Sequence, residues 1–74
     1  GVRVGKRCII VAKVFLGGQV TVGDDCWIAP GASILQGLSV GKNAFVGIGA
    51  VVIKNVKAGT VVVGNPARVL RKNN

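Results

Sequence analysis

The chain has no histidine, little acidity, few aromatic residues and only two cysteines. Its 74 residues carry two acidic side chains against ten Lys and Arg, which gives a formal charge of +8. Without His and without a Cys-x-x-Cys motif, the sequence lacks the usual ligand sets of a protein-held zinc ion, and we assign no metal. The two carboxylates, Asp24 and Asp25, are adjacent in a predicted turn. We interpret them as turn-forming residues rather than as an acid–base pair.

Long hydrophobic runs are absent as well. No stretch reaches the roughly 18 apolar residues of a membrane-spanning helix, and the chain does not begin with the charged and apolar regions of a signal peptide. The sequence therefore predicts no membrane span. Seventy-four residues make one small domain or a fragment of a larger protein. Because Gly1 falls inside a repeat, we expect the chain to be a truncated piece of a longer solenoid, or one with an unseen start.

That repeat is the strongest signal in the sequence: an aliphatic residue recurs every six positions. The series is Val4, Ile10, Leu16, Val22, Ile28, Ile34, Val40, Val46 and Val52, with Ala58 as a smaller continuation. Neither the helical period nor simple alternation produces a strict six, whereas short strands separated by tight turns do. The repeat predicts an all-β parallel β-helix of about four coils of 18 residues, three whole and a fourth begun. We expect coils over residues 1–63 and an exit turn and tail over 64–74, and the tail either caps the last coil or frays.

Stacking the chain at a period of 18 predicts which residues lie above one another. One inward column is Val4, Val22, Val40 and Ala58, and another is Cys8, Cys26, Ala44 and Val62. Because both cysteines occupy inward positions, we expect reduced thiols that pack as small hydrophobic groups, and hence a cytoplasmic protein.

The outward columns differ in polarity. One contains Ile9, Trp27, Phe45 and Val63, and another contains Lys6, Asp24, Lys42 and Thr60. An exposed column of large apolar side chains marks an interface, and so small a domain needs partners to be stable. We therefore predict self-association through the Ile9/Trp27/Phe45/Val63 face, with a ligand at its rim. Packing of Trp27 in this interface is favoured over contact with a cofactor.

The positive charges lie mainly at turns, with a cluster at Arg68, Arg71 and Lys72. Three aromatic residues offer little stacking surface for bases, so nucleic acid is not the favoured partner. A phosphate-bearing cofactor or a nucleotide-sugar suits the cluster better. The alternative, that these are solvated charges which keep an apolar solenoid soluble, stays open.

The hexads resemble the [LIV]-[GAED]-x-x-[STAV]-x repeat of the hexapeptide-repeat acyltransferases, which are left-handed β-helices. Residues 46–52 and 61–69 resemble the closing segment of bacterial sugar O- and N-acetyltransferases, and residues 4–18 are similar to UDP-3-O-acylglucosamine N-acyltransferase. The resemblance implies a left-handed coil and a homotrimer. It also implies acetyl-CoA or another acyl thioester as donor, bound in the cleft between neighbouring helices, and a sugar or nucleotide-sugar as acceptor.

The resemblance further implies which residues bind the donor. The corner positions that match are Ala29, Pro30, Gly47, Ile48 and Gly49, with Arg68 and Arg71 as candidates for the nucleotide phosphates. The general base of these families is a His that would lie immediately before Gly1, so no catalytic residue is assigned within the chain; Lys54 could substitute only if it were desolvated. A γ-carbonic-anhydrase-like zinc enzyme on the same fold needs His ligands that are absent here.

We therefore expect the C-terminal β-helix domain or fragment of an acyl-CoA-dependent sugar acyltransferase, inactive as these 74 residues alone. The alternative is a non-catalytic trimeric assembly or ligand-binding module.

Overall fold

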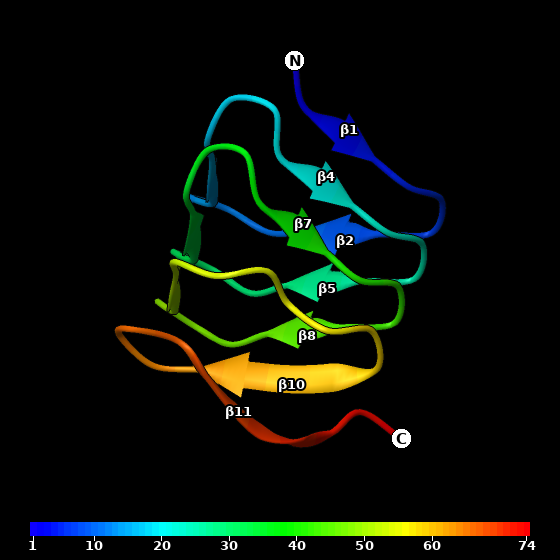
Figure 1. The fold of residues 1–74 in the computed structure, drawn as a ribbon, viewed down its shortest axis with the longest axis vertical. Helices are drawn as coiled ribbons and strands as arrows, with labels where there is room; N and C mark the ends of the chain where they lie inside the picture. The colour runs from blue at the N-terminus through cyan, green and yellow to red at the C-terminus, as the bar shows by residue number, and fades with distance from the viewer.

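Short strands build the whole molecule, and the computed structural model describes all 74 residues. Eleven strands and no helix are present (Figure 1). They are β1 (Arg3–Val4), β2 (Ile9–Ile10), β3 (Phe15–Leu16), β4 (Thr21–Val22), β5 (Trp27–Ile28), β6 (Ser33–Ile34), β7 (Ser39–Val40), β8 (Phe45–Val46), β9 (Val51–Val52), β10 (Thr60–Val63) and β11 (Arg68–Lys72). The chain forms no helix that is long and apolar enough to span a membrane.

The strands stack into three sheets that form the sides of a coil. β1, β4 and β7 form the first sheet, β3, β6 and β9 form another, and the third has the order β11-β10-β8-β5-β2. Through the first three coils each strand pairs in parallel with the strand 18 residues later, as Ile10 does with Ile28. The chain is therefore a left-handed parallel β-helix of three complete coils and part of a fourth, as the repeat and the family resemblance predict.

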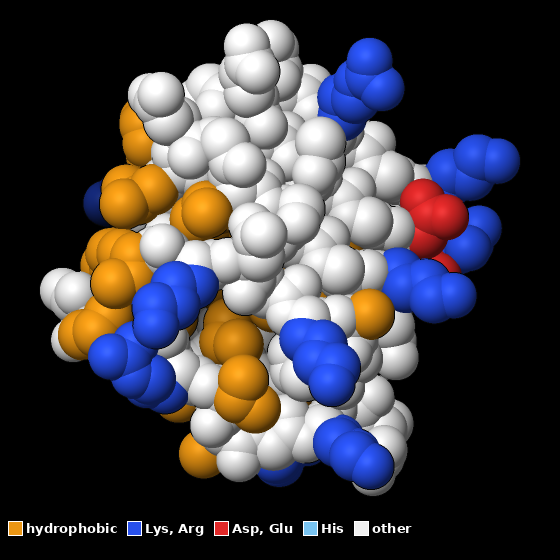
Figure 2. Space-filling model, in the orientation of Figure 1, with side chains coloured by type: hydrophobic (Ala, Val, Ile, Leu, Met, Phe, Trp, Pro, Cys, Tyr) orange, Lys and Arg blue, Asp and Glu red, His pale blue; other side chains and the backbone are white.

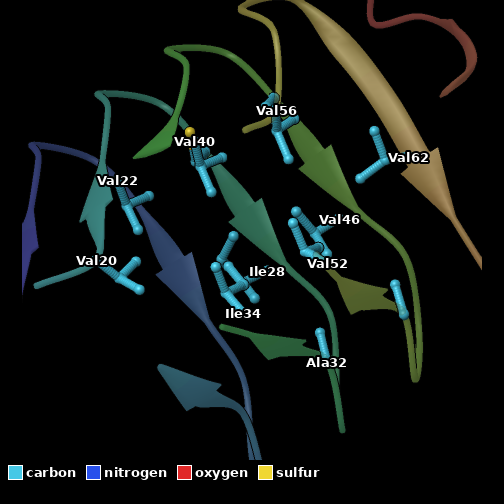
Figure 3. Packing of buried hydrophobic residues seen from close by; sticks show 13 residues of the cluster. Val20, Val22, Ile28, Ala32, Ile34, Val40, Val46, Val52, Val56 and Val62 are labelled. Atoms are coloured by element: carbon cyan, nitrogen blue, oxygen red, sulfur yellow. The ribbon is translucent and has the colours of Figure 1, made fainter. Parts of the chain in front are cut away.

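The hexad aliphatic residues fill the interior of the coil (Figure 3). Ile28, Ile34 and Val46 are completely buried, because coils above and below cover them. In the first coil, which only one neighbouring coil covers, Val4 and Ile10 remain exposed. Since each inward residue packs mainly on the coils beside it, burial increases towards the middle of the stack, as in other solenoids.

The fourth coil departs from the predicted register by two residues. Val56, not Ala58, bridges Val40, and β10 pairs with β8 so that Val61, not Val63, lies beside Phe45. The same shift places Thr60 rather than Val62 below Ala44. The predicted columns ending at Ala58, Val62, Val63 and Thr60 are therefore wrong in their last member, and the apolar outer column is Ile9, Trp27, Phe45 and Val61.

Asn55 explains why the chain can skip two residues. In the second coil the Thr21 N–H donates to the backbone carbonyl of Leu38 at 3.0 Å. One coil later the equivalent N–H, that of Ser39, donates instead to the Asn55 side-chain oxygen at 2.9 Å. The Val56 N–H donates back to the Ser39 carbonyl at 2.9 Å. Because a side-chain amide replaces a backbone carbonyl, a shorter turn still satisfies the strand above it.

The tail covers the end of the last coil. After a turn that begins at Gly64, β11 runs back antiparallel along β10, with a bulge between Val61 and Val62. It forms the lowest edge of the largest sheet (Figure 1). The tail thus caps the coil. The division of the chain into units 1–63 and 64–74 stays a prediction.

Candidate functional site

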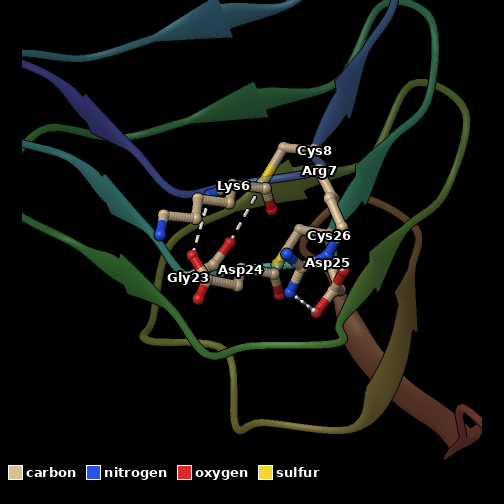
Figure 4. A network of polar contacts seen from close by, with 7 residues as sticks. All are labelled: Lys6, Arg7, Cys8, Gly23, Asp24, Asp25 and Cys26. Atoms are coloured by element: carbon tan, nitrogen blue, oxygen red, sulfur yellow. Dashed lines mark hydrogen bonds and ion pairs between the residues drawn. The ribbon is translucent and has the colours of Figure 1, made fainter.

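Both acidic side chains bind residues of the preceding coil at one corner (Figure 4). The Arg7 guanidinium donates twice to the Asp25 carboxylate, at 2.6 and 3.0 Å, and the Lys6 N–H donates to Asp24 Oδ1 at 2.7 Å. The hydrogen bond from Arg7 lowers the pKa of Asp25, and that of Arg7 is raised in return. These carboxylates link successive turns, so the interpretation as turn chemistry fits the geometry.

The two cysteines lie beside the same corner and are unpaired. Each thiol donates to a backbone carbonyl of the next coil, Cys8 to Gly23 at 3.0 Å and Cys26 to Gly41 at 3.1 Å. Burial raises the pKa of the Cys26 thiol, which keeps it protonated and unreactive at neutral pH. Cys26 belongs to the hydrophobic core, and the partly buried Cys8 packs against it.

A strip of apolar side chains runs down the outside of the largest sheet. The rings of Trp27 and Phe45 stack with centroids 6.0 Å apart and planes 16° from parallel. Ile9 is 50% exposed and Trp27 is 42% exposed. At the lower end, Arg71 lies opposite Val61 in the antiparallel pair. This strip, which we call the aromatic face, is therefore apolar along the coils and ends beside a cation.

The predicted donor-binding corners stack directly on one another. The Gly49 N–H donates to the Pro30 carbonyl at 3.0 Å, and the Ala29 N–H donates to the Val46 carbonyl at 2.9 Å. Ala29 and Gly47 are buried, whereas Pro30, Ile48 and Gly49 are exposed, Ile48 by 80%.

The backbone of Ile48 is unpaired at this exposed corner. Its N–H and its carbonyl make no hydrogen bond within the chain. Pro30, one coil above, has no N–H to offer. The corner therefore offers one free donor and one free acceptor, both on Ile48 between Gly47 and Gly49. A ligand amide has one donor and one acceptor that can pair with them.

The structure separates the two candidate arginines. Arg68 lies opposite Val63, and Val63 Cγ1 would lie 2.8 Å from a Cβ placed on Gly47. Arg68 is thus close to the lower end of the Gly47 corner, whereas Arg71 belongs to the aromatic face. Both side chains are exposed, and neither forms an ion pair. The donor-binding roles of both arginines and of the corner residues stay predictions.

The sequence did not predict a cavity of about 210 Å³ at the lower end of the coil. It lies between the short turn after β9 and strand β11, and Val52, Val56, Val62 and Ala67 line it. Lys54 is on its wall and is exposed, so it lacks the desolvation that a lysine base would need. No cluster of three His, Cys, Asp or Glu side chains is present.

Known proteins show the same architecture. No protein-family model matches the chain. The chain is 49% identical over 76 aligned positions to a 2,3,4,5-tetrahydropyridine-2,6-dicarboxylate N-acetyltransferase of Staphylococcus aureus. The aligned region covers 92% of this chain and 32% of that relative. PerB of Caulobacter crescentus, solved with CoA and GDP-perosamine, superposes with a TM-score of 0.88 at 29% identity, over 92% of this chain and 33% of PerB.

An Arabidopsis UDP-N-acetylglucosamine acyltransferase superposes with a TM-score of 0.94 at 30% identity, over 97% of this chain and 25% of that enzyme. The chain thus spans a third or less of the length of these proteins. The shared coil, the hexad repeat and the sequence identity agree, and the chain belongs to the hexapeptide-repeat acyltransferase family.

Proposed function

We propose that this chain is the β-helix portion of an acyl-CoA-dependent sugar acyltransferase and that it supplies part of the acyl-donor site. The proposed site is the stacked corner of Ala29, Pro30, Gly47, Ile48 and Gly49, with Arg68 at its lower end. Arg71, which lies with the aromatic face, is the second candidate for the nucleotide phosphates. Acetyl-CoA or another acyl thioester is the proposed donor, and a sugar or nucleotide-sugar is the proposed acceptor.

One observation carries this proposal: the backbone N–H and carbonyl of Ile48 are unpaired. They lie at a corner whose Gly47 packs against Val63, the residue that pairs with Arg68. The pantetheine arm of CoA contains two amides, each of which can pair with such groups. A guanidinium binds phosphate oxygens through two parallel hydrogen bonds. PerB, which shares this coil, was solved with CoA and a nucleotide-sugar, and this supports the same donor class here.

Acyl transfer needs one further group. A base must take the proton from the attacking hydroxyl or amine as that atom attacks the thioester carbonyl and the CoA thiol departs. The chain has no His, and both carboxylates are held in the Arg7 corner. We therefore expect donor binding, but no turnover, from these 74 residues.

The aromatic face supports the proposal of a homotrimer. Exposed Ile9 and Trp27 and half-buried Phe45 form a continuous apolar column on one side of the coil. An apolar column of this kind is stable when a second copy covers it. We also propose a cytoplasmic location, which the two unpaired cysteines support.

Replacing Ile48 by Pro tests the corner. The change removes the Ile48 N–H without breaking any hydrogen bond of the chain, and Pro30 occupies the equivalent place one coil above. We expect CoA to bind about 2- to 13-fold more weakly in calorimetric titration, which is the worth of one neutral hydrogen bond. Ile48→Ala, which keeps the N–H, is the matched control. Equal affinity for CoA in both variants would exclude the corner as the donor site.

The arginines are tested in the same titration. Arg68→Gln removes a charged donor close to the corner, and we expect a loss of about tenfold or more. Arg71→Gln, which lies with the aromatic face, should have the smaller effect. If the unaltered chain releases no heat with millimolar CoA, donor binding is wrong, and the alternative, a non-catalytic trimeric assembly module, is supported.

Light scattering at micromolar concentration tests the assembly. We expect a trimeric mass, and Trp27→Lys should give a monomer because it places a charge in the aromatic face. Phe15→Lys is the matched control, since Phe15 is an exposed aromatic residue on a different sheet. A monomeric mass for the unaltered chain would refute the trimer.

A further inference from the structure

Cys8 and Cys26 are stacked one coil apart, on the inner side of the same corner (Figure 4). The residues that follow them, Ile9 and Trp27, pair in parallel register, which places the two cysteine Cα atoms about 4.8 Å apart. This separation lies within the range of about 4.4–6.8 Å that a disulfide spans. Because these are the two cysteines of the chain, a disulfide within one molecule must join this pair.

The two thiols make equivalent contacts in successive coils. Each sulfur lies near the carbonyl two residues before it, at 3.7 and 3.8 Å, and near a carbonyl of the next coil, at 3.0 and 3.1 Å. Both side chains therefore leave the backbone in the same direction, and their Cβ atoms are also about 4.8 Å apart. A relaxed disulfide has a Cβ separation of about 3.5–4.5 Å. A bond between these cysteines would be strained, and strained disulfides are the easily reduced ones.

Cys8 is the thiol that a reagent in solution reaches first. It is half-buried, whereas Cys26 is only 2% exposed. The neighbouring corner is open to solvent, and Figure 2 shows its two acidic side chains at one edge of the molecule with Lys and Arg around them. The net charge of +8 favours the approach of an anionic reagent.

We propose that Cys8 and Cys26 form a reversible disulfide by exchange with a small anionic disulfide such as oxidised glutathione. The Cys8 thiolate attacks one sulfur of the reagent, whose S–S bond breaks and releases a first thiolate. The Cys26 thiolate then attacks the Cys8 sulfur of the mixed disulfide and releases a second thiolate. The protons lost by the two cysteines pass to the released thiolates, and the two electrons lost by the cysteines reduce the reagent.

The buried Cys26 carries out the slower step. Burial raises the pKa of its thiol, so it reacts poorly with reagents in solution. Its attack on the mixed disulfide needs no encounter in solution, because the target sulfur belongs to the cysteine stacked on it and proximity replaces a bimolecular step. This inference does not depend on donor binding at the Ile48 corner.

The disulfide would hold the first coil on the second. The inward residues Val4 and Ile10 of the first coil are exposed, and a segment with few buried contacts opens more readily than the middle of a structure. A covalent link between the coils restricts that opening. Oxidation should therefore stabilise the first coil, and reduction should release it.

Oxidised glutathione is the probe for the full chain, followed by mass spectrometry and by alkylation of free thiols. We expect a mixed disulfide on Cys8 and then a monomeric chain that has lost two hydrogen atoms and has no free thiol. Cys26→Ser should stop at the mixed disulfide. No reaction, a mixed disulfide that persists in the unaltered chain, or linked dimers as the main product would overturn the proposal.

A matched variant tests the order of the steps. Cys8→Ser combined with Ala44→Cys moves the pair one coil deeper, because Ala44 is stacked beneath Cys26, and Ala44 is completely buried. The spacing is kept but no thiol is accessible, so we expect oxidation at least about tenfold slower in a variant whose spectrum remains folded. Equal rates would contradict first attack by Cys8.

Hydrogen exchange measures the effect on the first coil. The N–H groups of Ile9 and Val11 donate to the second coil, and oxidation should slow their exchange about tenfold or more. The N–H of Ser33, which donates to the third coil, should exchange at an unchanged rate. Reduced glutathione should restore the original rates. Unchanged exchange at Ile9 would refute the stabilising role, and a bond that resists excess reduced glutathione would refute its reversibility.

Discussion

Gly17 and Gly18 are adjacent in the chain but should respond in opposite ways to replacement by Ala. A Cβ on Gly17 would lie 2.8 Å from the Cα of Gln36 in the next coil and closer still to its amide nitrogen. A Cβ on Gly18 would meet no atom within 4 Å. The backbone of Gly18 is also outside the left-handed region, so Ala fits there without strain.

The magnitudes follow from these contacts. Ordinary contacts of a Cβ begin near 3.4 Å, so Gly17→Ala must move the backbone of the next coil by more than half an ångström. That movement strains the 2.8 Å hydrogen bond from the Gly17 N–H to the Ile34 carbonyl. Overpacking of this kind costs about 1–3 kcal/mol, and more where the neighbour is rigid backbone. Gly18→Ala should instead stabilise by about 0.4–1 kcal/mol, because Ala has less freedom in the unfolded chain.

Thermal unfolding followed by circular dichroism measures both changes. For a domain of this size about 1 kcal/mol shifts Tm by roughly 4–8 °C, so Gly17→Ala should lower Tm by at least that amount while Gly18→Ala leaves it equal or higher. The argument rests on close stacking of successive coils. A Gly17→Ala variant as stable as Gly18→Ala would show that the coils are further apart than described.

Three other changes test separate features. Asn55→Ala removes the acceptor of the Ser39 N–H and should cost about 0.5–1.5 kcal/mol in denaturant unfolding; Asn74→Ala, at the exposed last residue, should have no effect. Ile34→Val removes one fully buried methylene group and should lower the free energy of unfolding by about 0.5–1.5 kcal/mol, with no change in m-value. Asp25→Asn tests the Arg7 pair. The pKa of Asp25 is lower in the folded chain than in the unfolded chain. The Arg7 pair therefore stabilises the fold fully above the unfolded pKa near 3.9, and this stabilisation is lost as the pH falls through the lower pKa of the folded state. The small Tm advantage of the unaltered chain should therefore disappear in acid, and an advantage that persists unchanged at pH 2 would contradict this account.

The sequence predicted the first three coils well, because one rule places every inward residue. Ile10 above Ile28, Trp27 above Phe45 and the stacked cysteines all follow from a period of 18. In a solenoid each residue packs on its neighbours in adjacent coils, so a regular repeat determines the contacts without knowledge of distant parts of the chain.

The prediction was wrong where a side chain replaced the backbone. The amide of Asn55 accepts the hydrogen bond that a carbonyl accepts one coil earlier, and nothing in the hexad pattern distinguishes such an amide from an ordinary turn residue. The sequence did contain a weaker sign of the two-residue shift. Ala58 is the smallest member of the hexad series, whereas Val56 and Val62 are also six residues apart and lie two residues ahead of the positions that the repeat predicts. Because protein cores are close-packed, the larger Val56 and Val62 side chains are preferred to Ala58 at the inward positions.

This slip of two residues also determines where the candidate sites lie. With an uninterrupted period of 18, residue 65 would lie below Gly47. The shorter turn places Val63 there instead, which directs the chain into β11 with Arg68 opposite Val63. The same turn leaves Val56 at the end of the core, facing the cavity with Lys54 and Lys57 beside it. The lower end of the proposed donor corner and the cavity beside β11 are therefore two consequences of one local event. A search by side-chain type would miss the proposed corner, because the groups proposed to bind the donor there are the backbone N–H and carbonyl of Ile48, which any residue except proline supplies in full.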